Sequence, residues 1–120
     1  MKKITNILVL LFCTLSVVAQ VASENLFYMV DTPESFESFK NHLSQISIVC
    51  PQSFQVSKEG VISGSVDHRI LELARANKIK VMPLIVNSGF TAQLLHTILS
   101  NPLARKRSIK MMLVYAKKYK

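Results

Sequence analysis

Residues 79–87 (IKVMPLIVN) limit the possible folds of this chain more than any other stretch. The stretch is apolar at nearly every position instead of alternating, and such runs are typical of strands covered on both faces of a parallel sheet. The sequence Asn87-Ser88-Gly89 predicts a loop at the carboxyl end of the strand, where α/β proteins place their sites. Pro83 is unusual for a central strand because proline has no N–H to donate. We therefore expect a buried parallel strand over 79–86.

The other residues alternate between strand and helix patterns. Strands are expected at 26–30 and 46–50, and helices at 31–43, 67–77, 91–99 and from 101 onward. Pro51 is expected to end the second strand, and two β-like runs around Lys58-Glu59-Gly60 predict a small β-hairpin inserted after it. This order is that of successive right-handed βαβ units, so the fold class is α/β with a parallel sheet. No strand follows the last helix, so we expect an unfinished domain.

The last predicted helix combines apolar residues at helical spacing with basic residues on its other faces. The apolar residues are Leu103, Ile109, Met112, Leu113 and Ala116, and the basic residues are Arg105, Lys106, Arg107, Lys110, Lys117 and Lys118. No acidic residue follows Asn101, so this helix is suited to an acidic polymer or an anionic membrane surface. The alternative, which we favour, is the solvated outer helix of an α/β fold. The basic face lacks interleaved aromatics, which argues against nucleic acid.

Residues 1–23 have the pattern of a secretory signal peptide, with Lys2 and Lys3 before an apolar centre and small residues at the end. A retained membrane anchor is the alternative, but the apolar run is shorter than the roughly 20 residues that span a bilayer. We expect a secreted or periplasmic protein with no stable membrane anchor after cleavage. Loss of the two lysines would lower the net charge from +8 to +6. Residues 24–120 are long enough for one small domain.

The sequence contains no recognisable catalytic, metal or cofactor constellation. The three histidines, His42, His68 and His96, lie on different predicted helices without ligand spacing. No glycine loop for phosphate, serine elbow or close carboxylate pair is present. Asp31 and Asp67 are better explained as helix caps, since Asp31 or Thr32 can cap the first helix and Ser65 or Asp67 the second. Cys50 would be the only thiol after cleavage, which excludes an intrachain disulfide and favours a small buried side chain over a catalytic thiol.

Polar and aromatic residues near the predicted strand ends form the candidate binding site. These residues are Tyr28, Gln52, Phe54 and Asn87. The carboxyl ends of parallel strands converge at one rim, so these side chains are expected to lie close together. Aromatic faces beside amide groups suit sugar rings, which present apolar patches bordered by hydroxyls.

Several segments, taken in order, resemble the start of family 18 glycoside hydrolases of the bacterial chitinase-like and spore-peptidoglycan-hydrolase-like branch. They are 27–31 (FYMVD), 35–39 (SFESF), 48–54 (IVCPQSF), 70–74 (ILELA), 80–87 (KVMPLIVN) and 99–105 (LSNPLAR). The resemblance implies a (β/α)8 (TIM) barrel, of which this chain would supply about three βα units, with 24–120 as an incomplete barrel domain. It places Tyr28 at the family's first-strand aromatic position and Asn87 at the third-strand rim.

The resemblance also implies cleavage of β-linked amino sugars, with the substrate's N-acetyl group as nucleophile. The family's catalytic acid ends a D-x-x-D-x-D-x-E motif on the fourth strand, which would begin just after Lys120. We therefore expect the N-terminal fragment of a secreted chitinase-like hydrolase that is inactive alone and would bind chitin or peptidoglycan in a complete barrel. The alternative is a small secreted carbohydrate- or cell-wall-binding protein without catalysis. The first predicts an aspartate-rich strand in the DNA after Lys120, and the second predicts a soluble monomer retained on chitin.

Overall fold

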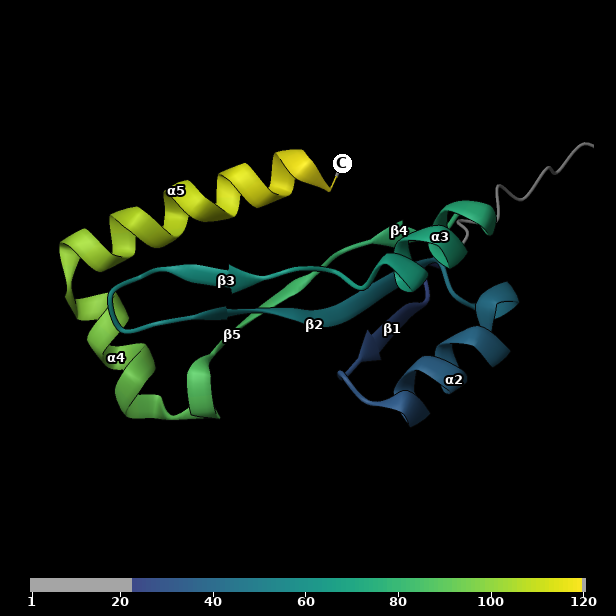
Figure 1. Cartoon of the computed structure of the whole chain (residues 1–120), viewed down its shortest axis with the longest axis horizontal. Helices are drawn as coiled ribbons and strands as arrows, with labels where there is room; N and C mark the ends of the chain where they lie inside the picture. Colours follow the sequence, from purple (N-terminus) through teal and green to yellow (C-terminus); the bar gives the residue numbers. More distant parts are fainter. Residues whose placement is uncertain (1–22, 120) are drawn as a thin grey trace, which may run out of the picture.

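A computed structural model describes residues 23–119, and the predicted signal peptide lies outside them except for Ser23. The chain has a mixed α/β fold with one five-stranded sheet (Figure 1). The strands are β1 Leu26–Met29, β2 Ile48–Val56, β3 Ile62–Gly64, β4 Lys80–Val81 and β5 Leu84–Asn87. The helices are α2 Pro33–Asn41, α3 His68–Ala76, α4 Ala92–Ser100 and α5 Pro102–Lys118, with 3-10 turns η1 Leu43–Gln45 and η2 Ser88–Phe90. None of these helices is both long and apolar enough to cross a membrane.

Strand β2 is the centre of the sheet. Its first half pairs in parallel with β1 on one edge and β4 on the other, and its second half pairs with β5 in parallel and β3 antiparallel. The predicted parallel strands and the predicted hairpin are therefore confirmed. Helices α2 and α3 lie at the end of the sheet that carries β1 and β4, whereas α4 lies at the end that carries the hairpin turn (Figure 1).

The predicted end of the second strand at Pro51 is wrong. Strand β2 continues to Val56, so the run that was expected to be a separate arm of the hairpin is its second half. Pro51 lies opposite Met29, and two residues later the register with β5 shifts: Gln52 pairs with Leu84 and Phe54 with Ile85, which leaves Ser53 as an extra residue. A bulge of this kind bends a strand and interrupts its ladder, which explains why proline is tolerated beside it.

The predicted strand over 79–86 is split in two. Strands β4 and β5 are separated by Met82 and Pro83, because proline cannot donate to a ladder. All four residues of β5 are only half-buried, so the expected coverage of both faces is wrong. The apolar run reflects a strand that is partly covered on both faces, with Ile85 packed against the buried core.

The buried core lies between the sheet and the helices, with Phe39, Val49 and Ile62 as its largest fully buried side chains. Local capping follows the predicted chemistry: Asp67 caps α3, and Asn101 caps α5, whose first residue is Pro102. The packed face of α5 differs from expectation. Its apolar residues Leu103, Ile109, Met112, Leu113 and Ala116 are all exposed, whereas Ala104 and Ser108 are buried.

The hairpin turn explains which face of α5 is buried. A Cβ atom on Gly60 would lie 2.0 Å from the carbonyl oxygen of Ala104, so the turn and the helix approach backbone to backbone. The Ser108 hydroxyl donates to the Gly60 carbonyl oxygen (3.2 Å), and Arg107 Nη1 donates to the Glu59 carbonyl oxygen (2.8 Å). Only small side chains fit such an approach, so the helix turns its bulkier residues outward.

We expect Gly60→Ala to destabilise the fold by about 3 kcal/mol or more, because the methyl group collides with the α5 backbone. Gly89→Ala is the matched control: both glycines have a left-handed backbone (φ 76° and 72°), but a Cβ on Gly89 would meet only the Thr91 methyl group at 3.8 Å. The control should lose only the left-handed strain, about 1–2 kcal/mol. Urea unfolding monitored by circular dichroism measures both, and equal losses would contradict the close approach.

Candidate functional site

Tyr28 and Gln52 are brought together on adjacent strands. The Gln52 amide nitrogen donates to the Tyr28 hydroxyl, and Tyr28 lies opposite Cys50 in the register of β1 with β2. The tyrosine is 58% exposed, so its ring face is open to a ligand while its hydroxyl is held by the amide. An aromatic face bordered by a fixed amide is the arrangement expected for a sugar ring.

Phe54 and Asn87 do not join this pair. The Phe54 side chain is 2% exposed, and its ring packs against Tyr115 of α5 and Tyr119 directly after it, with centroid distances of 4.5 and 5.9 Å. Asn87 Nδ2 donates to the carbonyl oxygen of Thr91 (2.7 Å) and so holds the loop after β5. Phe54 is thus a core residue, and Asn87 has a structural hydrogen bond.

The four residues also lie at different heights along β2. Tyr28 is level with Cys50, whereas Asn87 is level with Val56. At about 3.3 Å per residue, this separation along the strand is about 20 Å. The residues do not share one rim because β2 continues past Pro51, and the strand ends are therefore staggered.

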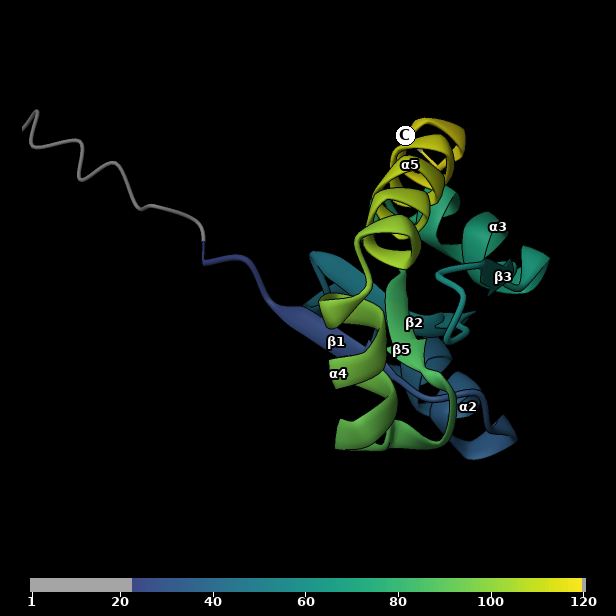
Figure 2. The ribbon, with the colours of Figure 1, turned by 90° about the vertical axis from the view of Figure 1, so that its left-hand side faces the viewer.

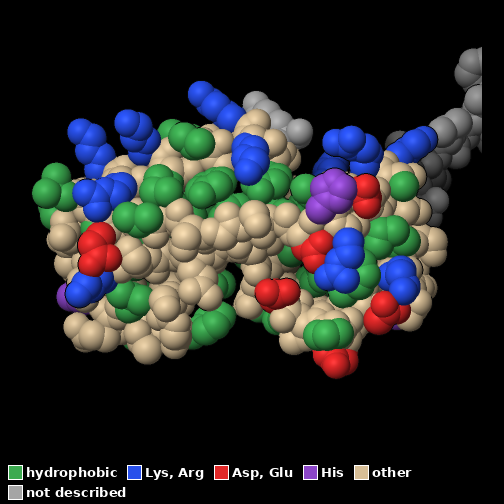
Figure 3. All heavy atoms as spheres, viewed as in Figure 1, with side chains coloured by type: hydrophobic (Ala, Val, Ile, Leu, Met, Phe, Trp, Pro, Cys, Tyr) green, Lys and Arg blue, Asp and Glu red, His purple; other side chains and the backbone are tan. Residues whose placement is uncertain are grey.

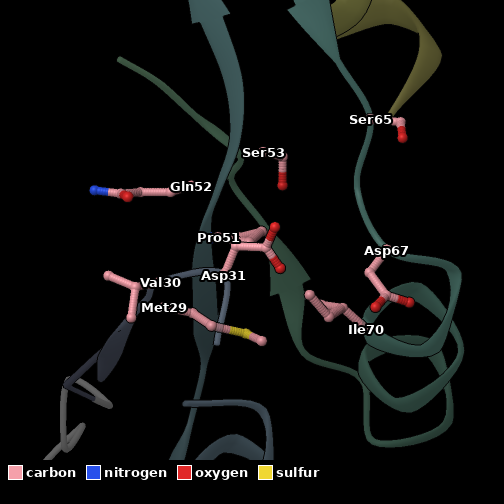
Figure 4. A pocket seen from close by; sticks show the side chains of 9 residues that line it. All are labelled: Met29, Val30, Asp31, Pro51, Gln52, Ser53, Ser65, Asp67 and Ile70. Atoms are coloured by element: carbon pink, nitrogen blue, oxygen red, sulfur yellow. The ribbon is translucent and has the colours of Figure 1, made fainter. Parts of the chain in front are cut away.

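A hollow of about 320 Å³ lies beside the carboxyl end of β1. Figure 4 shows Asp31, Ser53 and Asp67 directed into it, with Gln52 pointing away. Thr32, not Asp31, caps α2, since its hydroxyl accepts the backbone N–H of Ser35 (3.2 Å), so the expected capping role of Asp31 is wrong. Its carboxylate is exposed and makes no ion pair with any residue in 23–119. The hollow can therefore accept hydrogen bonds from a polar ligand.

The second carboxylate of the hollow is already paired. Asp67 Oδ2 lies 2.6 Å from Arg69 Nη2, and Asp67 Oδ1 accepts the Arg69 backbone N–H (2.8 Å). These hydrogen bonds, with the positive charge of Arg69, lower the pKa of Asp67. The Arg69 guanidinium also stacks 4.4 Å from the ring centre of Phe36. Asp67 thus stays ionised at neutral pH and does not suit the role of a general acid.

A second hollow of about 280 Å³ continues from Asp31 and Ser53 along the bulge to Phe90. Gly64 permits this shape, since a Cβ there would lie 2.1 Å from the Ser53 carbonyl oxygen. Phe90 is 66% exposed and has a positive φ of 53°, an unusual backbone for a bulky residue. Sequence reasoning missed Asp31, Ser53 and Phe90 as site residues. Of these three, only Phe90 could have been identified from the sequence, because it follows the glycine loop after a strand.

No metal centre or reactive thiol accompanies these hollows. Within residues 23–119 no three His, Cys, Asp or Glu side chains gather where they could hold a metal ion. Cys50 is buried and unpaired, and burial raises the pKa of its thiol, which disfavours the thiolate. The hollows offer hydrogen-bonding groups, the exposed aromatic ring of Phe90 and the exposed carboxylate of Asp31.

Several solved structures share this fold, among them two spore cortex-lytic enzymes and a chitinase. The Bacillus cereus spore cortex-lytic enzyme SleL matches 80% of this chain and 25% of its own, with a TM-score of 0.67 and 20% identity. SleL from Bacillus megaterium QM B1551 matches 80% of this chain and 24% of its own, with a TM-score of 0.66 and 18% identity. A chitinase from Chromobacterium violaceum ATCC 12472 matches 82% of this chain and 32% of its own, with a TM-score of 0.69 and 13% identity.

At these identities the likeness concerns the fold alone. The chain spans a quarter to a third of the length of the solved structures that it matches. No family model and no curated protein matches the sequence. The described residues therefore have the α/β fold of one part of a lytic enzyme or chitinase.

The loss of folding stability at acid pH should reveal the Asp67–Arg69 ion pair. Because the pKa of Asp67 is lower in the folded than in the unfolded state, its stabilising effect is present above the unfolded pKa and is lost as the pH falls through the folded pKa. Asp67→Asn keeps a capping side chain, so this variant should be less stable at about pH 7 but lose less stability between about pH 5 and pH 2.

Urea midpoints measured across this pH range test the pair. Arg69→Gln should flatten the acid dependence in the same way, and the double variant should add little to either single change. An acid dependence that is the same in Asp67→Asn and the unchanged protein would contradict the assignment.

Proposed function

We propose that this chain forms the first three βα units of a (β/α)8 barrel of the family 18 glycoside hydrolase type. The supporting observation is its fold, shared over about four-fifths of the chain with two spore cortex-lytic enzymes and a chitinase. Three parallel strands joined through helices, with a hairpin after the second, agree with such an arrangement. Residues 1–23 would direct export, which suits an enzyme that acts on chitin or peptidoglycan.

The proposed ligand is a polymer of β-linked N-acetylamino sugars, and Tyr28 and Gln52 are its contacts on this chain. The exposed tyrosine ring offers a surface for the apolar face of a sugar, and the amide offers hydrogen bonds to hydroxyl or acetamido groups. Asn87 would act indirectly by holding the loop that carries Phe90. Phe54 has no part in this contact surface because its ring is buried under α5.

Catalysis is not expected from these residues alone. The chain contains only two aspartates, Asp31 and Asp67, and no D-x-x-D-x-D-x-E motif. Asp67 is bound to Arg69, and Asp31 faces the first hollow without a second free carboxylate beside it. Substrate-assisted hydrolysis needs both an acid for the leaving group and a carboxylate that orients the acetamido group. The chain would supply sugar contacts, and the acidic motif would come from polypeptide beyond Lys120.

Binding to chitin tests the contact pair. Tyr28→Ala should weaken the binding of chitin oligosaccharides about tenfold, or about 1.4 kcal/mol, because the stacking surface is lost. Leu26→Ala is a matched control two residues away on the same face of β1, and Leu26 is 61% exposed. It should bind as the unchanged protein does. Isothermal titration calorimetry provides the affinities, and equal losses in both variants would remove Tyr28 from the proposed site.

A hydrolysis assay tests the proposal that the acidic catalytic motif is not part of this 120-residue chain. The purified 120-residue chain should release no sugar from chitin oligosaccharides or from spore peptidoglycan. Chromatography of long incubations detects cleavage, and a catalytically competent chitinase added to the same substrate serves as the positive control. Turnover by this chain, if it persisted after repeated purification, would refute the proposal of an incomplete active site.

A further inference from the structure

Helix α5 packs on the sheet with one face and leaves the opposite face uncovered. Ala104 and Ser108 are buried, and Met111, Tyr115 and the following Tyr119 pack against the buried core. These residues recur every three or four positions and so lie on one side of the helix. At about 100° per residue, the opposite side carries Leu103, Lys106, Ile109, Lys110, Leu113, Val114 and Lys117. These seven residues are called the outer face of α5.

The outer face is rich in large apolar side chains. Leu103, Ile109, Leu113 and Val114 are between 52% and 75% exposed. The sequence predicted a solvated outer helix, but such a helix usually turns its apolar side chains toward the core and polar ones toward water. Here the core side is occupied by small and aromatic residues, and most of the aliphatic ones point outward. Their exposure indicates a surface that is suited to an apolar contact.

The other three residues of the outer face are lysines that lie between the apolar ones. Lys106, Lys110 and Lys117 are exposed, and no ion pair in the described residues involves them. From Asn101 to Tyr119 the chain has no acidic residue. Figure 3 shows basic side chains projecting from the upper margin over α5, with apolar ones between them. The outer face is therefore apolar and positively charged along its whole length.

The position of α5 makes this face accessible to a broad surface. The helix lies along the upper boundary of the molecule in two perpendicular views, with the sheet beneath it and no other described helix or strand above it (Figures 1 and 2). From Leu103 to Lys117 the outer face extends about 21 Å along the helix axis, at about 1.5 Å per residue. A flat partner could contact all of it at once.

We propose that the outer face of α5 binds reversibly to the surface of an anionic lipid bilayer. The helix lies parallel to the surface, because its apolar and basic side chains share one face. The four apolar side chains enter the boundary between headgroups and acyl chains. The lysines lay their apolar stems along the same boundary and place their ammonium groups at the lipid phosphates.

An acidic polymer fits this face less well. Phosphate groups of such a polymer would attract the lysines, but a polymer without apolar groups would leave Leu103, Ile109, Leu113 and Val114 exposed to water. A second copy of this chain could cover the apolar side chains, but it would bring the lysines of two helices together, and like charges in contact oppose association. An anionic bilayer satisfies both the apolar and the basic side chains.

The membrane contact does not depend on the proposed barrel. In a (β/α)8 barrel the helices form the outer ring. The outer face of α5 points away from the sheet, so further barrel units would leave it uncovered. Sugar contacts at Tyr28 lie on β1, not on this helix. The two proposals can therefore hold together or fail separately.

A tryptophan placed on the outer face tests the contact locally. The full chain has no tryptophan, so the emission of a single one reports only its own position. In Leu113→Trp the emission should move to shorter wavelength when phosphatidylglycerol vesicles are added, because the indole ring leaves water. Leu95→Trp is the matched control on α4, which lies below α5 in Figures 1 and 2; Leu95 is 45% exposed against 60% for Leu113. Its emission should not move.

The lysines are tested in the Leu113→Trp background. Lys106→Gln, Lys110→Gln and Lys117→Gln together should weaken vesicle binding about hundredfold, since each lysine near an anionic surface contributes about fivefold. Arginine at the same three positions keeps the charge and should change the affinity less than about threefold. Binding of the lysine form should also weaken as salt is raised from about 0.1 M to about 1 M.

The emission shifts decide between the possible partners. A shift of Leu113→Trp that requires the lysines or arginines, without a shift of Leu95→Trp, supports the proposal. No shift, an equal shift at both positions, or the same shift on uncharged phosphatidylcholine vesicles overturns it. Binding to polyphosphate without a shift on vesicles would assign the face to an acidic polymer. A dimer that forms in place of vesicle binding would assign it to a second copy.

Discussion

Backbone hydrogen bonding along both edges of β2 is the interaction on which the rest of the structure depends. Every other strand in residues 23–119 pairs with β2, two with its first half and two with its second. The bulge at Ser53 lies where one set of partners gives way to the other. Both hollows lie at this change of partners, because Ser53 lines each of them. The geometry of the candidate site is thus a consequence of how one long strand is shared.

Local signals in the sequence were sufficient for the elements and several of their ends. Apolar periodicity predicted the three parallel strands, and capping chemistry predicted Asp67, Asn101 and Pro102 at helix starts. The continuation of β2 past Pro51 was not predictable from the local sequence, because a bulge depends on the neighbouring strands with which β2 pairs. The buried face of α5 was missed for a similar reason. The helical spacing of its apolar residues predicted that they would face the sheet, but they are exposed. The close approach of the Gly60 backbone instead buries the small residues Ala104 and Ser108.

The candidate site was likewise predicted only in part. Tyr28 and Gln52 were predicted as neighbours, since adjacent strands place them together. Phe54 was misplaced because one extra residue in β2 reverses the alternation of side chains, which sent its ring toward α5. Asp31 was missed because two adjacent residues could cap α2, and the Thr32 hydroxyl does so. The first hollow thereby keeps an exposed carboxylate that sequence reasoning had assigned to a helix end.

The aromatic packing of Phe54 with Tyr115 and Tyr119 has a consequence for spectroscopy. The chain has no tryptophan and only three tyrosines, so these phenol rings dominate its near-ultraviolet absorption. Two of the three, Tyr115 of α5 and Tyr119 directly after it, pack against Phe54 in an asymmetric aromatic environment, whereas Tyr28 is exposed. Near-ultraviolet circular dichroism therefore reports mainly the seating of α5 on the sheet, separately from the helical content seen at shorter wavelengths. The protein therefore carries its own spectroscopic probe of how α5 packs on the sheet.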